Sequence, residues 1–252
     1  MGRESVHLPQ PPNPAQPLLG ASMHRVLLLV LLLFLTTAAR GAFLPTIRIE
    51  AVEVSDPPAY AALVARANEA MRTKYQVALF LRAYSAIVPP GEPSASFTLS
   101  PAASSGTLAT NRERFASDSD LADLRRQLTA AAPSASMSVE LEAVRFDGTN
   151  APGWLCNSLV RTNDESALLA RVAELAALPT PAKPLINVFR VTQGTDAYTH
   201  LVSINAASAT ELAALLQSFA ARAGTLEFSH ASGARCTLVA TTLYREMTTP
   251  PP

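Results

Sequence analysis

The stretch that decides the fold runs from Leu185 to Leu212 and reads LINVFRVTQGTDAYTHLVSINAASATEL. It opens with an apolar, β-branched run, turns at residues 193–196 around a glycine, and continues into a second apolar run. Two such runs on either side of a glycine turn predict a β-hairpin. Ser208 then stands three residues before Glu211, a capping box that predicts the start of a helix. The stretch therefore predicts strand, strand and helix in succession.

The elements around this stretch complete one unit. Trp154–Thr162 predicts a strand, and Asn163 is expected to cap a helix that ends before Pro179. The predicted elements are, in order, strand 154–162, helix 164–178, strands 185–191 and 197–204, a helix from Ser208 to the glycine stop at Gly224, and a final strand 235–245, preceded by a bend at 230–233. This order is the βαββαβ arrangement called ferredoxin-like.

The preceding segment, residues 46–147, repeats the same order. Its strand from Thr46 changes phase near Ala51–Val52, which predicts either a bulge or a strand end buried on both faces. Asp56 is expected to cap the helix that follows. The other predicted elements are strands 76–88 and 94–99, a loop at 102–110, a helix opening at Ser117 and Asp120, and strand 136–146. The chain thus predicts two tandem domains, 46–147 and 154–247, and a short tail at 248–252.

Each predicted sheet needs a second layer to cover the face that its helices leave bare. Helices cover one face of each sheet, and a bare second face would expose an apolar patch larger than soluble proteins usually show. The predicted fold class is therefore α+β, with two tandem ferredoxin-like (βαββαβ) domains packing as an intrachain dimeric α/β barrel.

Residues 23–41 are typical of a signal peptide. The apolar run from Val26 to Leu35 follows His24 and Arg25, and small residues precede a cleavage point after Gly41. Ten residues are too few to span a hydrocarbon core of about 30 Å, although an uncleaved anchor is the alternative. Residues 1–22 are interpreted as an upstream extension. We expect a periplasmic or secreted protein with no membrane span after cleavage.

The motifs of this chain are similar to those of a known superfamily. The segments that show this similarity are the strand and turn from Asn187 to Gly194, the polar strand Thr199–Ile204, and the helix start Ser208–Leu212. In these motifs the chain resembles the dimeric α/β-barrel superfamily, specifically the antibiotic-biosynthesis-monooxygenase-like (ABM) and NIPSNAP-like domains and twin-domain bacterial secreted proteins. The resemblance implies cofactor-free oxygenation of polyphenols, or haem degradation by an Asn, Trp and His set, as activities to consider. Trp154, Asn157 and His200 do not reproduce that set, so no catalytic role is carried over.

Charge and motifs exclude several function classes. The chain carries 20 basic and 20 acidic residues, which provides no basic field for nucleic acid. Neither a Gly-x-Ser-x-Gly elbow nor a glycine-rich phosphate loop occurs. His200 and His230 are far apart, without cysteines or carboxylates at ligand spacing, so no metal site or cofactor is predicted.

A few residues remain as low-priority ligand-binding candidates. Arg82 and Arg190 occupy similar places in the second strand of each half. If they face the space between the sheets, they either bind an acidic ligand or pair with Glu140 or Glu142, and if they lie outward they are surface charges. The full candidate set is Arg82, Trp154, Asn157, Arg190 and His200.

The two cysteines, Cys156 and Cys236, lie near the starts of strands expected to be antiparallel neighbours. That register separates them by roughly 15 to 20 Å, too far for a disulfide, so two buried thiols are predicted.

The leading hypothesis is an exported tandem ABM-like protein without catalytic activity, which acts as a scaffold or binds a small apolar or acidic molecule. The alternatives are a cofactor-independent monooxygenase acting on an aromatic or polyphenolic substrate, and an envelope protein-interaction module. Monomer and homodimer are both open. A cavity of several hundred Å³ between the sheets favours binding or oxygenation, whereas a filled interior favours interaction.

Overall fold

The computed structural model describes residues 45–87, 96–133, 135–148, 153–223 and 236–247. The predictions for the leader (23–41), the extension (1–22), the stop at Gly224, the bend at 230–233 and the tail (248–252) lie outside these residues. The described elements belong to one compact unit, Phe43–Pro252. Within them, no helix is both long enough and apolar enough to cross a membrane.

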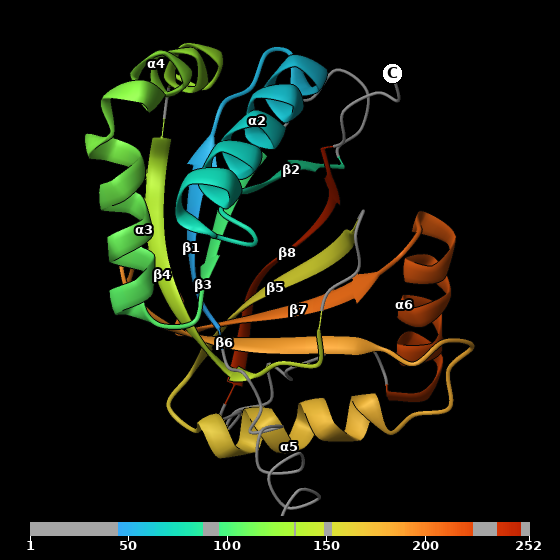
Figure 1. The fold of residues 1–252 in the computed structure, drawn as a ribbon. Coiled ribbons are helices and arrows are strands. Elements are labelled where there is room, and N and C mark those ends of the chain that lie inside the picture. The colour runs from blue at the N-terminus through green and yellow to red at the C-terminus, as the bar shows by residue number, and fades with distance from the viewer. Residues whose placement is uncertain (1–44, 88–95, 134, 149–152, 224–235, 248–252) are drawn as a thin grey trace, which may run out of the picture. The chain divides into compact units, whose positions relative to one another are not determined.

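The eight described strands close into one antiparallel barrel in the order β1-β3-β2-β8-β5-β7-β6-β4 (Figure 1). Each half contributes four neighbouring strands in the ferredoxin-like order, and the halves join where β2 pairs with β8 and β4 pairs with β6. The predicted α+β class and intrachain barrel are therefore confirmed. The strands are β1 (Thr46–Val52), β2 (Arg82–Ala86), β3 (Ser96–Ala102), β4 (Ala135–Arg145), β5 (Trp154–Thr162), β6 (Leu185–Gln193), β7 (His200–Ala206) and β8 (Cys236–Glu246).

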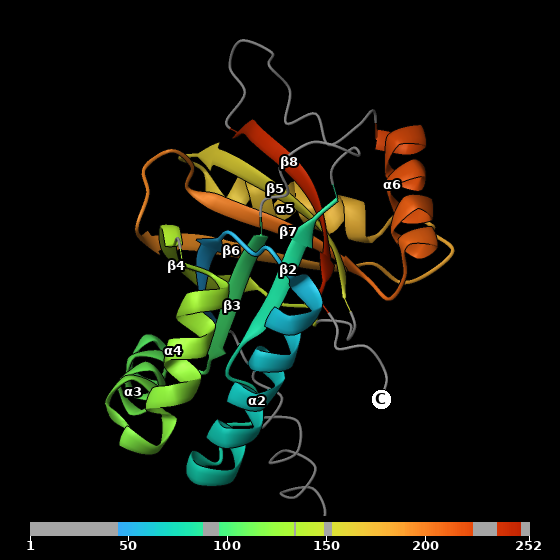
Figure 2. The same ribbon diagram turned by 90° about the horizontal axis from the view of Figure 1, so that it is seen from above.

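The helices lie on the outside of the barrel, in two groups (Figure 2). The first half carries α2 (Pro57–Tyr75), α3 (Ser105–Ser117), the 3-10 turn η1 (Ser119–Leu121) and α4 (Ala122–Ala131). The second half carries α5 (Glu165–Ala176) and α6 (Ala209–Ala223). Each strand therefore has one face toward the barrel interior and one toward helices.

The second half is held together by an apolar layer between its sheet and its helices. Ile186 and Ile204 on the strands pack with Leu168, Val172 and Leu215 on the helices, and all five are at most 1% exposed. Ser208 caps α6 as predicted by accepting from the Glu211 N–H. The Glu211 carboxylate accepts from the Ala207 N–H, one residue before the Ser208 N–H that a capping box would use.

The first half keeps its apolar core between helices. Ala67 and Met71 of α2 pack with Leu121 and Leu124 at the start of α4 and with Phe80, and each of these side chains is at most 7% exposed. The Asp56 carboxylate accepts from the Ala59 N–H and caps α2 as predicted. The predicted irregularity of β1 is a bulge, because its pairing with β4 shifts between Ala51 and Val52.

The predicted strand 76–88 is wrong in its first half. Gln76 has φ 59° and ends α2 in the left-handed conformation. The Asn68 side chain then accepts from the N–H groups of Phe80 and Leu81 and donates to the Leu81 carbonyl. Since these backbone groups bond to a helix side chain, strand pairing begins only at Arg82.

The predicted loop at 102–110 is also wrong, because α3 begins there. The Ser104 hydroxyl accepts from the Thr107 N–H and caps the helix. Ser117 ends α3 instead of opening a helix, and Asp118 caps the short turn that leads into α4. In the second half, Asp164 caps α5 in place of the expected Asn163.

The cysteine prediction is confirmed. Both thiols are free and buried. In the β5–β8 ladder Cys156 lies opposite Leu243, and Cys236 lies opposite Thr162. Six residues of strand separate the two positions, or about 20 Å, well beyond disulfide reach.

Candidate ligand-binding site

A cavity of about 610 Å³ opens at one end of the barrel. At this end β1, β2, β5 and β6 begin and β3, β4 and β7 end. Ile47, Leu99, Leu155 and Phe189 form apolar walls contributed by both halves. Residues 75–79, which run from the last residue of α2 onward, and one face of α3 complete the lining. The cavity has the size and the apolar character of a small-molecule site.

Arg82 supplies the buried positive charge of the cavity. It is the first residue of β2, and its side chain is 14% exposed. Its Nη1 donates to the Tyr84 hydroxyl at 3.4 Å, and its Nε lies 3.7 Å from Glu246 Oε1 on β8. Burial raises the pKa of Tyr84, and the Glu246 charge raises it further, so the phenol keeps its proton at neutral pH.

Two asparagines add uncharged polar groups to the lining. Asn111 on α3 is 7% exposed and Asn205 on β7 is 3% exposed. The Asn205 amide donates to the carbonyl and hydroxyl oxygens of Ser203. Asn111 makes no side-chain hydrogen bond to any residue that the structure describes, so its amide is available to a ligand. A third lining asparagine, Asn187, is committed to the backbone of Asp147 and Gly148.

The charge of the lining is one-sided. The described lining contains two arginines, Arg82 and Arg114, and no aspartate or glutamate. Arg114 is exposed and lies over the Tyr75 ring, with its guanidinium carbon 5.3 Å from the ring centroid. Glu246, near Arg82, offsets part of this charge. The arrangement favours an apolar ligand with an anionic or hydrogen-bond-accepting group.

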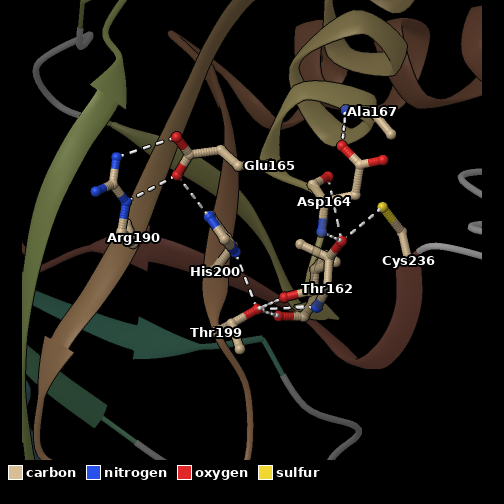
Figure 3. Close-up of polar contacts among 9 residues, drawn as sticks. Thr162, Asp164, Glu165, Ala167, Arg190, Thr199, His200 and Cys236 are labelled. Atoms are coloured by element: carbon tan, nitrogen blue, oxygen red, sulfur yellow. Dashed lines mark hydrogen bonds and ion pairs between the residues drawn. The ribbon is translucent and has the colours of Figure 1, made fainter.

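Arg190 does not share the position of Arg82. Because Phe189 faces the barrel interior, strand alternation directs Arg190 outward toward α5. There its Nε and Nη2 donate to the Glu165 carboxylate at 2.8 and 3.0 Å (Figure 3). The similarity of the two arginines in sequence is thus not an equivalence in space, and the outward alternative holds for Arg190.

His200 also faces α5. Its Nε2 lies 3.0 Å from Glu165 Oε2 and its Nδ1 lies 2.9 Å from Thr199 Oγ1 (Figure 3). Burial acts to raise the pKa of Glu165, but the hydrogen bonds from His200 and Arg190 outweigh it and lower that pKa. The Thr199 hydroxyl also bonds to the backbone of Val160 and Thr162. This network fastens the start of α5 to the sheet and lies outside the cavity.

The remaining candidates do not line the cavity either. Trp154 packs with the helix-facing core of the second half. Asn157 alternates with Leu155 and lies opposite Ser203 on the interior face of β5, where it is 8% exposed. Its Oδ1 is buried without a hydrogen-bond partner among the described residues. Of the predicted set, the structure places only Arg82 in the cavity lining.

Sequence reasoning missed Tyr84, Asn111 and Asn205. Strand alternation after Arg82 was a signal for Tyr84, since residues two apart share a face. No signal identified Asn111, because its segment lies on a helix whose start was taken for a loop. Among the described residues, no group of three or more His, Cys, Asp or Glu side chains is placed to hold a metal ion.

No protein-family model matches the chain, and no curated protein matches it. Solved structures do. A putative monooxygenase from Fusobacterium nucleatum is 7% identical with a TM-score of 0.51, over 83% of this chain and 94% of that one. A putative monooxygenase from Lactobacillus acidophilus is 8% identical with a TM-score of 0.48, over 81% and 95%. The R173A mutant of chlorite dismutase from Candidatus Nitrospira defluvii is 9% identical with a TM-score of 0.49, over 85% and 95%. At 7% identity, the likeness to the Fusobacterium nucleatum structure shows the fold alone: an α+β barrel of ferredoxin-like halves.

Proposed function

We propose that this protein binds a small, mainly apolar molecule with a carboxylate or similar anionic group in the barrel cavity, without transforming it. The observation that carries the proposal is the 610 Å³ cavity with apolar walls and Arg82 inside it. A partly buried guanidinium gives a strong, directional hydrogen bond to a carboxylate. Tyr84 and Asn111 lie in the same lining as further donors.

The chemistry of the lining favours binding over catalysis. General base catalysis at neutral pH usually needs a histidine or a carboxylate within hydrogen-bond reach of the substrate. The described lining contains neither, and His200 faces α5 instead. The cavity also argues against the alternative of an interaction module with a filled barrel.

The test compares two probes of nearly equal shape, 2-naphthoate and the uncharged 2-naphthamide, by isothermal titration calorimetry on the full chain. We expect 2-naphthoate to bind about tenfold more tightly, since a charge-assisted hydrogen bond contributes about 1.5–3 kcal/mol. Arg82→Met is expected to remove this preference. The matched control, Arg190→Met, removes an arginine outside the cavity and should leave it intact.

Two results would contradict the proposal. One is the absence of heat with either probe at millimolar concentration. The other is an Arg82→Met protein that unfolds at the wild-type temperature and still prefers 2-naphthoate.

The second candidate is cofactor-independent oxygenation of an aromatic phenol. Its support is the Arg82–Tyr84 pair in an apolar cavity, which would stabilise a phenolate, together with the structural likeness to the putative monooxygenase from Fusobacterium nucleatum. Oxygen uptake with a hydroquinone separates the candidates. The binding proposal expects no uptake above a heat-denatured control, and sustained uptake lost in Arg82→Met would establish the oxygenase instead.

The finer family assignment and the location are part of the proposal. The chain is proposed to be a tandem ABM-like protein whose residues 23–41 are cleaved on export to the periplasm or the medium. The supporting features are the residue motifs of the sequence and the leader pattern. N-terminal sequencing of the protein recovered from an expressing bacterium is expected to begin after Gly41, and an intact N-terminus would contradict export by this leader.

A further inference from the structure

A second cavity, of about 340 Å³, lies outside the barrel between the first-half sheet and its helices. Thr98 and Ser100 line it from β3, and Tyr60 and Arg112 line it from α2 and α3. Leu99, between the two β3 hydroxyls, lines the barrel cavity instead. One layer of strand therefore separates the two cavities.

Three hydroxyls open onto this second cavity from residues that are otherwise buried. Tyr60, Thr98 and Ser100 are each 4% exposed. None of their hydroxyls forms a hydrogen bond with another residue in the described ranges. Their oxygens are not among the fully buried atoms without a partner, so they are accessible from the cavity. A polar molecule in the cavity can therefore hydrogen-bond to all three.

Glu50 adds a negatively charged hydrogen-bond acceptor. Its Oε1 accepts from Arg48 Nε at 3.0 Å and lies 3.0 Å from Arg112 Nη2. Its second oxygen makes no hydrogen bond to a described residue. Burial raises the pKa of Tyr60 to about 12, with a further contribution from Glu50, so this hydroxyl remains a donor at physiological pH. Arg48 and Arg112 compensate the charge of Glu50, so this carboxylate can accept hydrogen bonds from an uncharged ligand.

The remaining lining is mostly apolar and partly aromatic, apart from Thr129 and from Arg125, whose Nη1 donates to the carbonyls of Phe115 and Asp118. Phe80 and Phe115 contact each other, with ring centroids 4.8 Å apart, and both line the cavity. Leu128 of α4 lines it as well. The cavity thus offers hydroxyls and a carboxylate from one set of residues and an apolar surface from another. A molecule with many hydroxyls and one apolar face matches both.

We propose that the cavity between the first-half sheet and α2, α3 and α4 binds a small neutral polyol about the size of a monosaccharide. Its hydroxyls donate to the Glu50 carboxylate and exchange hydrogen bonds with Tyr60, Thr98 and Ser100. Its ring carbons pack on the aromatic pair. This site is separate from the barrel cavity and does not depend on the function proposed for it.

The test uses D-glucose and myo-inositol as probes, with cyclohexanol as a ring of similar size that has one hydroxyl. Ligand-observed NMR on the full chain is expected to show at least one of the two polyols binding with a Kd of about 10 mM or tighter, and cyclohexanol binding at least tenfold more weakly. The double variant Thr98→Val, Ser100→Ala is expected to weaken polyol binding by at least about tenfold, because two hydrogen bonds are lost.

Two controls keep the result decisive. Thr237→Val removes an exposed strand hydroxyl on β8 and should leave binding unchanged. The thermal unfolding temperature of the double variant reports whether the fold is intact, and Tyr60→Phe serves as a second test if the double variant unfolds. The proposal is overturned if neither polyol binds at 50 mM (about five times the expected Kd), if cyclohexanol binds equally well, or if the folded variants bind like the wild type.

Discussion

The two halves of the barrel share strand order and helix placement, but they differ in the layer between sheet and helices. In the second half this layer is apolar, with Ile186, Val202 and Ile204 buried against α5 and α6. In the first half, Thr98 and Ser100 face the helices, and a cavity remains between the layers. This difference shows that strand alternation and the pairing of neighbouring strands maintain the same topology in both halves. The polarity of the helix-facing side of each sheet can differ without changing that topology.

The first half tolerates a polar sheet face because its apolar contacts lie elsewhere. Its helices pack on one another through Met71, Leu121 and Leu124. Its strands direct Phe97, Leu99 and other apolar side chains into the barrel. The second half also directs Leu155 and Phe189 into the barrel, and it places Asn157, Ser203 and Asn205 on the same interior face. Polar side chains therefore occur on the helix-facing side of the first-half sheet and on the interior side of the second-half sheet.

The largest effect should come from truncating the apolar layer of the second half. Ile204 is 1% exposed, and Ile204→Ala is expected to lower the free energy of unfolding by about 2–5 kcal/mol through lost burial and a new cavity. Ser100→Ala on the corresponding strand of the first half removes a hydroxyl without a described protein partner, and should change it by less than about 1 kcal/mol. Urea unfolding measures both. If both variants lose the same free energy of unfolding, the layers of the two halves contribute equally to stability and the contrast is wrong.

Two glycines, one in each half, offer a second contrast. Gly194 has φ +103°, and an added Cβ would lie 2.1 Å from the Ser138 carbonyl oxygen on β4. Gly194→Ala is therefore expected to cost about 3 kcal/mol at the β4–β6 junction. Gly106, in the first turn of α3, has only Ser104 Oγ at 3.9 Å, so Gly106→Ala should stabilise by up to about 1 kcal/mol. Thermal unfolding of both variants checks the opposite signs, and a shared sign would contradict this account.

Acid sensitivity should also differ between the halves. Hydrogen bonds from Lys74 and then Tyr75 lower the pKa of Asp118 to about 2, below its value in an unfolded chain. The stabilisation is therefore complete above about pH 4 and is lost as the pH falls toward 2. The pKa of Glu165 is also lowered, so its contribution is likewise lost in acid. Asp118→Asn should flatten the fall in melting temperature between pH 4 and 2. If Glu165→Gln flattens that range and Asp118→Asn does not, the assignment is reversed.

How far the sequence predicts this molecule also differs between the halves. In the second half, β5 is predicted to the residue and the Ser208–Glu211 cap is correct, because apolar periodicity and caps agree there. In the first half, Asn68 replaces strand pairing at residues 80–81, and Ser104 starts a helix of low apolar content. Long-range side-chain bonds and weakly amphipathic helices leave little local pattern.

The candidate site was less predictable than the fold. Arg82 was identified because it occupies a place in the second strand of its half like that of Arg190 in the other half. Arg190 met the same criterion but lies on the other face, since a shift of one residue in strand phase reverses the direction of a side chain. Asn111 and Asn205 come from different halves and meet only when the barrel closes.

The smallest expected effect concerns the thiols of the second half, and it tests how tightly its layer is sealed. Burial raises the pKa of Cys156 to about 11, and its side chain is 2% exposed, so little reactive thiolate forms at neutral pH. The Cys236 thiol donates to Thr162 Oγ1 at 3.3 Å. We expect intact-mass spectrometry to show no change with a reductant, and a small thiol reagent to label both cysteines only after denaturation. Rapid labelling of Cys156 in the folded protein would mean that the layer between sheet and helices in the second half opens readily. The layers of the two halves would then differ in amino-acid composition but not in how tightly they are packed.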